Sequence, residues 1–170
     1  MLDKELTYRI AFSLIRGNNR VIADELLSRI GSEEEFFSAS SRLLEMQIGN
    51  KTKFTDDSYR HQLLDKARKE VDFINKNNIS PIYFKDANYP QRLLDCDDAP
   101  LMLYTLGNCD LNSSHIISVV GTRHATHYGV EMTERIIEGL AKRLDNIIIV
   151  SGLAYGIDIA AHRAALKNGI

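Results

Sequence analysis

The sequence predicts a mixed α/β protein, in which an all-helical domain over residues 1–78 precedes a parallel sheet with flanking helices over residues 79–170. Two observations support this. Apolar residues recur at helical spacing through the first 78 residues, as Leu6, Ile10 and Leu14 do. After residue 80, short apolar runs alternate with helical segments, which is typical of right-handed βαβ units.

Sequence signals at helix ends divide the N-terminal region further. The Gly17-Asn18-Asn19 stretch interrupts the first apolar stripe, and Gly31 ends the second. Ser32 and Glu35 have capping-box spacing, and a long amphipathic segment runs up to the end of the region. We therefore expect five helices, at about residues 2–14, 21–30, 33–37, 43–46 and 56–77.

The C-terminal region contains two short apolar runs and then two longer βα repeats. The runs at 116–120 and 147–150 are continuously apolar, which favours strands buried on both faces. Helices are expected at about 127–144 and 157–167, and Gly169-Ile170 resembles the start of a third strand. Because two such strands cannot make a stable doubly wound sheet, we expect an incomplete sheet in a piece of a longer protein.

Composition excludes several classes of function. The 170 residues carry a net charge of −2, so an anion site must be local and not a property of the whole surface. We expect a cytoplasmic protein, because no apolar stretch approaches the roughly 20 residues of a membrane span and the first residues lack the order of a signal peptide. Cys96 and Cys109 lack metal-ligand spacing and are interpreted as free thiols. We expect no metal and no cofactor.

Two glycine turns follow the two longer strands. Parallel strands deliver such turns to the same sheet edge, where helix N-termini favour anions. Arg123 adds a planar guanidinium that suits phosphate. The sequence therefore predicts a phosphate site made of Gly121, Thr122, Arg123 and Thr126 in the first turn, and of Ser151, Gly152, Ala154 and Gly156 in the second.

Other interpretations of these residues remain open. Arg123 is equally a solvated loop residue or the partner of a nearby carboxylate. Asp158 is explained by a position near a helix start, although its i, i+4 spacing from His162 also allows a general-base pair. His124 and His127 fit solvated turn residues or additional phosphate ligands. No serine or cysteine nucleophile is placed beside the pair, so we predict no catalytic residue.

Both turns resemble signatures of a known family. The segments 118–123 with 126–129, and 151–158 with 161–166, resemble the two signatures of the DNA-processing protein DprA (Smf) family. Upstream, Tyr89-Pro90-x-x-Leu93 and Ala99-Pro100-x-x-Leu103-Tyr104 resemble the segment that leads into the family's domain. The resemblance covers about residues 79–170.

The resemblance implies a Rossmann-like domain that binds single-stranded DNA and loads the recombinase RecA during natural transformation. It assigns the phosphate-gripping arginine to Arg123 and the contacts of the second turn to Ser151, Gly152 and Ala154. Tyr155 stands where many relatives have arginine, and an exposed tyrosine there suits base stacking. The resemblance also implies a homodimer of the full-length protein. A Rossmann-like nucleotide hydrolase or transferase is the alternative.

The N-terminal helices resemble, more weakly, a SAM or helix-hairpin-helix domain. Gly17 and Asn19 occupy the positions of the two hairpin glycines. Because the second glycine is replaced, we expect this hairpin to pack or to contact protein and not to hold DNA.

Overall fold

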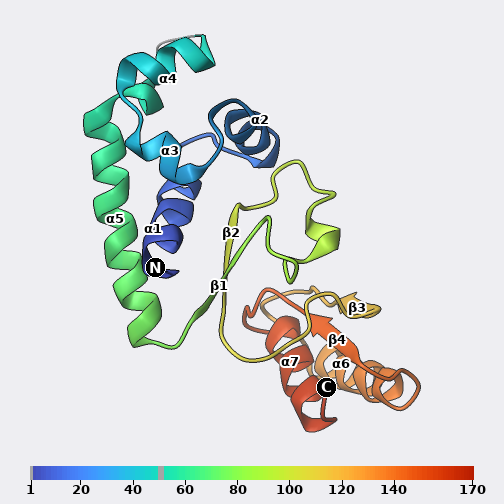
Figure 1. The fold of residues 1–170 in the computed structure, drawn as a ribbon. Helices are drawn as coiled ribbons and strands as arrows, with labels where there is room; N and C mark the ends of the chain where they lie inside the picture. The colour runs from blue at the N-terminus through green and yellow to red at the C-terminus, as the bar shows by residue number, and fades with distance from the viewer. Residues whose placement is uncertain (1, 50–51) are drawn as a thin grey trace. The chain divides into compact units, whose positions relative to one another are not determined.

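The computed structural model describes residues 2–49 and 52–170 and divides into two compact units, one ending at Asn112 and one from Ser113 to Ile170 (Figure 1). The N-terminal helices, small sheets and flanking helices make a mixed α/β chain, as the sequence predicts. The division falls later than the domain boundary expected at 78/79, because the first two strands pack on the helical core. The 78/79 boundary itself stays a prediction.

In its described part the first unit contains five α-helices, which confirms the five expected segments. Side chains cap four of them: Asn19, Ser32, Ser40 and Asp56 each accept a hydrogen bond from an amide in the first helical turn. Asn19 therefore serves as a helix cap in the hairpin. The helices are α1 (Leu2–Ser13), α2 (Arg20–Ile30), α3 (Glu33–Ser38), α4 (Ser41–Ile48) and α5 (Asp57–Lys76).

The core of the first unit lies around α1. Ile10, Ala11 and Phe12 are fully buried there, and the ring of Phe12 packs edge-on to Phe36 at 5.3 Å. Two strands, β1 (Ser80–Tyr83) and β2 (Met102–Thr105), pair antiparallel and contribute Ile82, Tyr83 and Met102 to the same core. A lone two-stranded ribbon is barely stable in water, so its burial against the helices explains why it belongs to this unit.

The second unit is a parallel βαβα arrangement. Strand β3 (His115–Ser118) leads to α6 (His127–Ala141), and β4 (Ile147–Val150) leads to α7 (Ile157–Lys167). The two strands pair in register from His115 opposite Ile147 to Ser118 opposite Val150. Figure 1 shows α6 and α7 beside this pair.

Helices cover one face of the parallel pair, and the other face is only partly buried, with Ile116 and Ile148 half-buried. Ile147 and Ile149 are buried and pack with Ile117 and Val119 against α6 and α7. The alternate side chains face away, and Val150 and Val120 are 45% and 79% exposed. The expectation of strands buried on both faces is therefore wrong for this structure, because both helices pack on the same side. Ile170 is not in a strand: Gly169, with φ of 73°, ends the chain's last helical turn.

No helix in the described ranges is long and apolar enough to cross a membrane. Within those same ranges, no group of three or more histidine, cysteine or acidic side chains is arranged to hold a metal ion.

Candidate functional site

The two glycine turns begin side by side at the carboxyl edge of the parallel pair. The last ladder bond runs from the amide of Val119 to the carbonyl of Val150, at 2.9 Å. Just beyond it, the hydroxyl of Ser151 donates to the carbonyl of Val119, at 2.7 Å. The parallel pairing of β3 and β4 thus brings both turns to one edge, as the sequence predicts. Ser151, which begins the second turn, is hydrogen-bonded to the residue that follows β3.

Gly156 allows the second turn to lie directly against the first. A Cβ atom at Gly156 would lie 2.1 Å from the carbonyl oxygen of Thr122 and 2.7 Å from that of Arg123. Its φ of 84° is also unfavourable for other residues. The next amide, of Ile157, donates to the carbonyl of Thr122 at 3.2 Å. The sequence assigns Gly156 to the phosphate site, but in the structure the space beside its Cα atom is occupied by the backbone of the first turn.

The side chain of Ile157 fills the space beside the first turn. A Cβ atom at Gly121 would lie 2.6 to 2.8 Å from three of its carbon atoms. A Cβ atom at Gly129, in the first turn of α6, would lie 3.4 Å from its Cδ1 atom, an ordinary contact. Gly121 is therefore required by the packing of the two turns on each other.

Asp158 joins the two turns by hydrogen bonds. Its Oδ1 accepts from the amide of Gly121 at 3.2 Å, and its Oδ2 accepts from the amide of Gly152 at 3.1 Å. The side chain is only 4% exposed, and it lies in the first turn of α7, where the helix dipole favours a negative charge. One carboxylate thus fixes two turns that are 37 and six residues away along the chain.

Of the two interpretations of Asp158, the structure supports a position near a helix start and not a pair with His162. Among the interactions of the described residues, none joins these two side chains, and Nε2 of His162 is buried without a hydrogen-bond partner. The carboxylate is instead bound to the two amides. The arrangement therefore offers no Asp–His general base.

Several donors of the predicted phosphate site are engaged within the chain. The hydroxyl of Ser151 and the amides of Gly121 and Gly152 donate to Val119 and to Asp158. The Oγ1 atom of Thr122 accepts from the amide of His124 at 3.2 Å. Ser151 and Gly152 could therefore donate to a phosphate only if their hydrogen bonds to Val119 and Asp158 were broken.

Other groups of the predicted site are free to meet a ligand. Arg123 is exposed, and no hydrogen bond or ion pair of its side chain occurs within the described ranges. Thr126 caps α6 by accepting from the amide of Gly129 at 3.1 Å, which leaves its hydroxyl proton available. Ala154 accepts a bond from Ile159 and lies in the same turn as Tyr155, which is 85% exposed.

Sequence reasoning did not assign two features of this edge. The first is the bridging role of Asp158, for which the only signal in the sequence is the presence of an acidic residue at this position, two residues after Gly156. Tyr128, in the first turn of α6, is 70% exposed, and Leu153 has a φ of 55° and is 69% exposed. With Tyr155, they are the exposed apolar and aromatic side chains of the second turn and of the first turn of α6.

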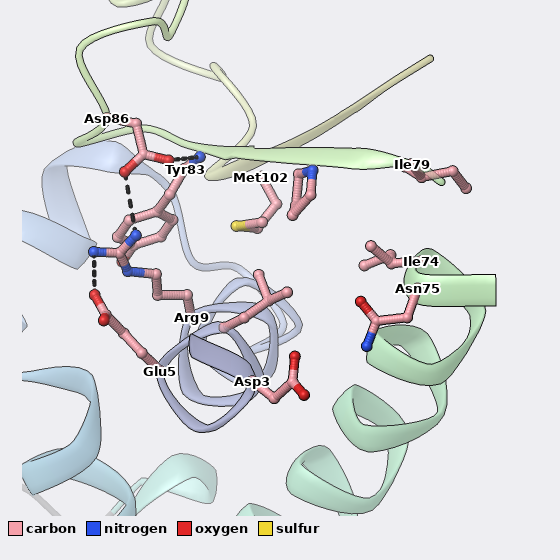
Figure 2. A pocket seen from close by; sticks show the side chains of 11 residues that line it. Asp3, Glu5, Arg9, Ile74, Asn75, Ile79, Tyr83, Asp86 and Met102 are labelled. Atoms are coloured by element: carbon pink, nitrogen blue, oxygen red, sulfur yellow. Dashed lines mark hydrogen bonds and ion pairs between the residues drawn. The ribbon is translucent and has the colours of Figure 1, made fainter. Parts of the chain in front are cut away.

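A pocket of about 330 Å³ in the first unit contains none of the predicted residues (Figure 2). Its cation, Arg9, is paired with Glu5 at 2.5 Å and with Asp86 at 3.1 Å, and it lies over the ring of Tyr83 at 5.0 Å. The hydroxyl of Tyr83 donates to Glu33 at 2.6 Å. Because the cation of this pocket is already paired with two carboxylates, the glycine-turn edge is the stronger candidate site for an anion.

Comparison with known proteins gives one consistent result. A family described as DNA recombination-mediator protein A matches residues 80–170. DNA processing protein DprA of Streptococcus pneumoniae is 46% identical over 84 residues, which cover 49% of this chain and 29% of that protein. Protein Smf of a Synechocystis species is 28% identical over 188 residues, covering 99% of this chain and 43% of that protein.

The fold gives the same answer. The X-ray structure of DprA from Streptococcus pneumoniae matches with a TM-score of 0.59 and 25% identity, and the match covers 95% of this chain and 53% of that one. The chain thus spans less than half the length of the two curated relatives. Because the family match covers more than half of the chain and includes both glycine turns, this chain belongs to the DNA recombination-mediator protein A family.

Proposed function

We propose that this chain binds single-stranded DNA at the glycine-turn edge of its second unit. The observation that carries the proposal is Arg123, an exposed cation that has no partner among the described residues and belongs to the first of two turns held together by Asp158. A guanidinium suits a phosphate because its planar fork donates two parallel hydrogen bonds. With a net charge of −2, the chain has no general attraction for DNA, so a local cation of this kind is needed.

The strand's phosphates are proposed to follow the outer rim of the edge. Arg123 forms the first contact, from a turn that Gly121 and Thr122 shape, and the hydroxyl proton of Thr126 is a second donor. The second turn is shaped by Ser151, Gly152, Ala154 and Gly156. The amide of Ala154 donates no hydrogen bond within the described ranges, so it is available to a phosphate. Backbone and hydroxyl donors of this kind position a strand without reading its sequence.

The exposed aromatic side chains favour a single strand over a duplex. Tyr155 is proposed as a stacking platform for an unpaired base, and Tyr128 and Leu153 are further exposed apolar side chains of the two βα repeats. Bases are available for stacking only when they are not paired, and stacking tolerates any sequence. The combination of a phosphate-binding cation and a stacking ring is typical of single-strand binding.

The wider role follows from the family. We propose that the whole protein is a non-catalytic mediator in DNA uptake and natural transformation, which loads the recombinase RecA onto single strands in the cytoplasm and acts as a homodimer. In this proposal the second unit is part of a Rossmann-like domain, and the N-terminal helices form a SAM or helix-hairpin-helix-like domain. The nucleotide-hydrolase alternative loses its general base, because Asp158 is bonded to Gly121 and Gly152.

Fluorescence anisotropy with a labelled oligonucleotide tests the proposal. Arg123→Ala is expected to weaken binding. Arg143→Ala is a matched control that removes an exposed arginine from the turn after α6, so that the length of the helix, roughly 20 Å, lies between it and the start of α6. The single strand is expected to bind more tightly than a duplex of the same length. Equal affinity of Arg123→Ala and the wild type, or no preference for the single strand, would contradict the proposal.

A further inference from the structure

We propose that the carboxylate of Asp158 occupies the place that a bound phosphate takes in nucleotide-binding sheets, and that it thereby excludes free phosphate and nucleotides from the space between the two turns. In open α/β sheets, amides at a strand–helix turn and the following helix N-terminus bind the phosphates of a nucleotide. Here the amides of Gly121 and Gly152 converge on the two oxygens of one carboxylate, at 3.2 and 3.1 Å.

The geometry leaves no space for a second anion between the turns. Asp158 is 4% exposed, and a Cβ atom at Gly152 would lie 3.0 Å from its Oδ2 atom. On the other side, Ile157 fills the space beside Gly121. An incoming phosphate would have to displace a carboxylate that has two hydrogen bonds and lies at the start of α7, where the helix dipole stabilises it.

The negative charge of Asp158 also disfavours a phosphate between the turns. A nucleotide phosphate at these amides would meet a buried negative charge, and like charges in such a site repel strongly. A phosphodiester at Arg123 lies outside this space, at an exposed cation that has no partner in the part of the chain that the structure describes. Asp158 thus acts as a specificity-determining residue, which lets the edge take a polynucleotide strand while it rejects mononucleotides and inorganic phosphate. The placement of the DNA phosphates at Arg123 rests on the proposed function, whereas the exclusion of free phosphate by Asp158 does not.

Titration of the chain with inorganic phosphate, followed by the NMR signals of the Gly121 and Gly152 amides, tests this inference. The wild type is expected to show no saturable shift of either amide. Asp158→Ala frees both amides and is expected to show saturable shifts of both, with a midpoint at least about tenfold below the highest phosphate concentration at which the wild type shows none. Asp158→Asn retains an acceptor oxygen and the side chain's size but loses the charge, so a weaker gain centred on one of the two amides is expected.

A matched control removes a carboxylate elsewhere in the same unit. Glu131→Gln changes the net charge as Asp158→Asn does, on the exposed surface of α6, and is expected to leave phosphate binding unchanged. Saturable shifts of the glycine amides in the wild type would overturn the inference, and this outcome requires no variant to fold. It would equally be overturned if Asp158→Ala or Asp158→Asn retained dispersed spectra and gained no phosphate binding.

The outcome is separable from that of the proposed function. If the Asp158 variants gain no phosphate binding while Arg123→Ala still weakens the oligonucleotide complex, the assignment of Asp158 fails and single-strand binding stands. If phosphate binding appears in the Asp158 variants but Arg123→Ala binds the oligonucleotide as the wild type does, the proposed strand contact fails and the role of Asp158 stands.

Discussion

The two units each bury a charged side chain, and the two charges hold different parts of the molecule. In the first unit, Arg60 is 1% exposed, donates to the carbonyl of Phe36 at 2.8 Å and pairs with Asp57. In the second unit, Asp158 is 4% exposed and accepts from two turn amides. Arg60 fastens helix to helix inside a large core, whereas Asp158 fastens two loops at a surface edge. A buried charge with hydrogen-bonded partners therefore stabilises the fold in one unit and the candidate site in the other.

The unpaired groups differ between the units as well. In the first unit Arg9 has two carboxylate partners and an aromatic ring. In the second unit Arg123 has no partner within the described ranges, and Tyr155 and Tyr128 are largely exposed. Interactions that are completed internally stabilise a fold, and those left open at a rigid edge are available to a ligand. This difference makes the second unit the proposed binding unit.

The largest expected effect is on stability and concerns Arg60. Arg60→Ala removes buried packing and leaves the carbonyl of Phe36 without its donor, so the free energy of unfolding is expected to fall by about 3 kcal/mol. Urea unfolding followed by circular dichroism measures this. The control Arg68→Ala removes an exposed arginine from the same helix and is expected to change stability by less than about 0.5 kcal/mol. Equal unfolding midpoints for the wild type and Arg60→Ala would contradict the claim that the buried charge of Arg60 stabilises the first unit.

An intermediate effect is expected at Tyr155. Tyr155→Ala is expected to weaken oligonucleotide binding by about 1–3 kcal/mol, because one base loses its stacking partner. Tyr155→Phe retains the ring and is expected to bind as the wild type does. Tyr104→Ala is the control in the other unit, where a half-exposed tyrosine is removed from β2. If Tyr104→Ala weakened binding as much as Tyr155→Ala, the assignment of binding to one unit would be wrong.

The smallest expected effect concerns Tyr83 and depends on pH. Burial, followed by the hydrogen bond to Glu33, raises the pKa of Tyr83 above its ordinary value of 10. The folded state therefore retains the phenol proton more tightly than the unfolded state, and this contribution to stability is complete below pH 10 and declines as the pH rises above it. Tyr83→Phe is expected to lower the free energy of unfolding by about 1 kcal/mol at neutral pH.

Urea midpoints measured below and above pH 10 check this prediction. The wild type is expected to lose more stability over that interval than Tyr83→Phe, because only the wild type has this proton to release. Parallel losses in the two proteins would show that the buried tyrosine does not govern the alkaline transition of the first unit.

Local signals in the sequence predicted much of the fold. Periodicity and capping residues predicted the five N-terminal helices, and alternating apolar runs with glycines predicted the two βα repeats and their shared edge. The covering of the strands was not predicted correctly. A run such as 147–150 is apolar on both faces, and nothing in it tells which face the helices will cover.

The internal contacts of the site also lay beyond local reasoning. The sequence explains Asp158 by a position near a helix start, with a pair to His162 as an alternative, but neither interpretation contains its bond to the amide of Gly121, 37 residues away. Likewise, the sequence assigns Gly156 to the phosphate site, although its missing side chain admits the backbone of Thr122. Such contacts arise when two turns meet in space, and spacing along one segment does not contain them.

The salt dependence of oligonucleotide binding tests the central claim most directly. If Arg123 neutralises one phosphate of a single strand, the slope of log affinity against log salt is expected to be shallower by roughly 0.7 in Arg123→Ala than in the wild type. Arg143→Ala is expected to retain the wild-type slope. Identical slopes for the wild type and Arg123→Ala would contradict the claim that this arginine binds the DNA backbone.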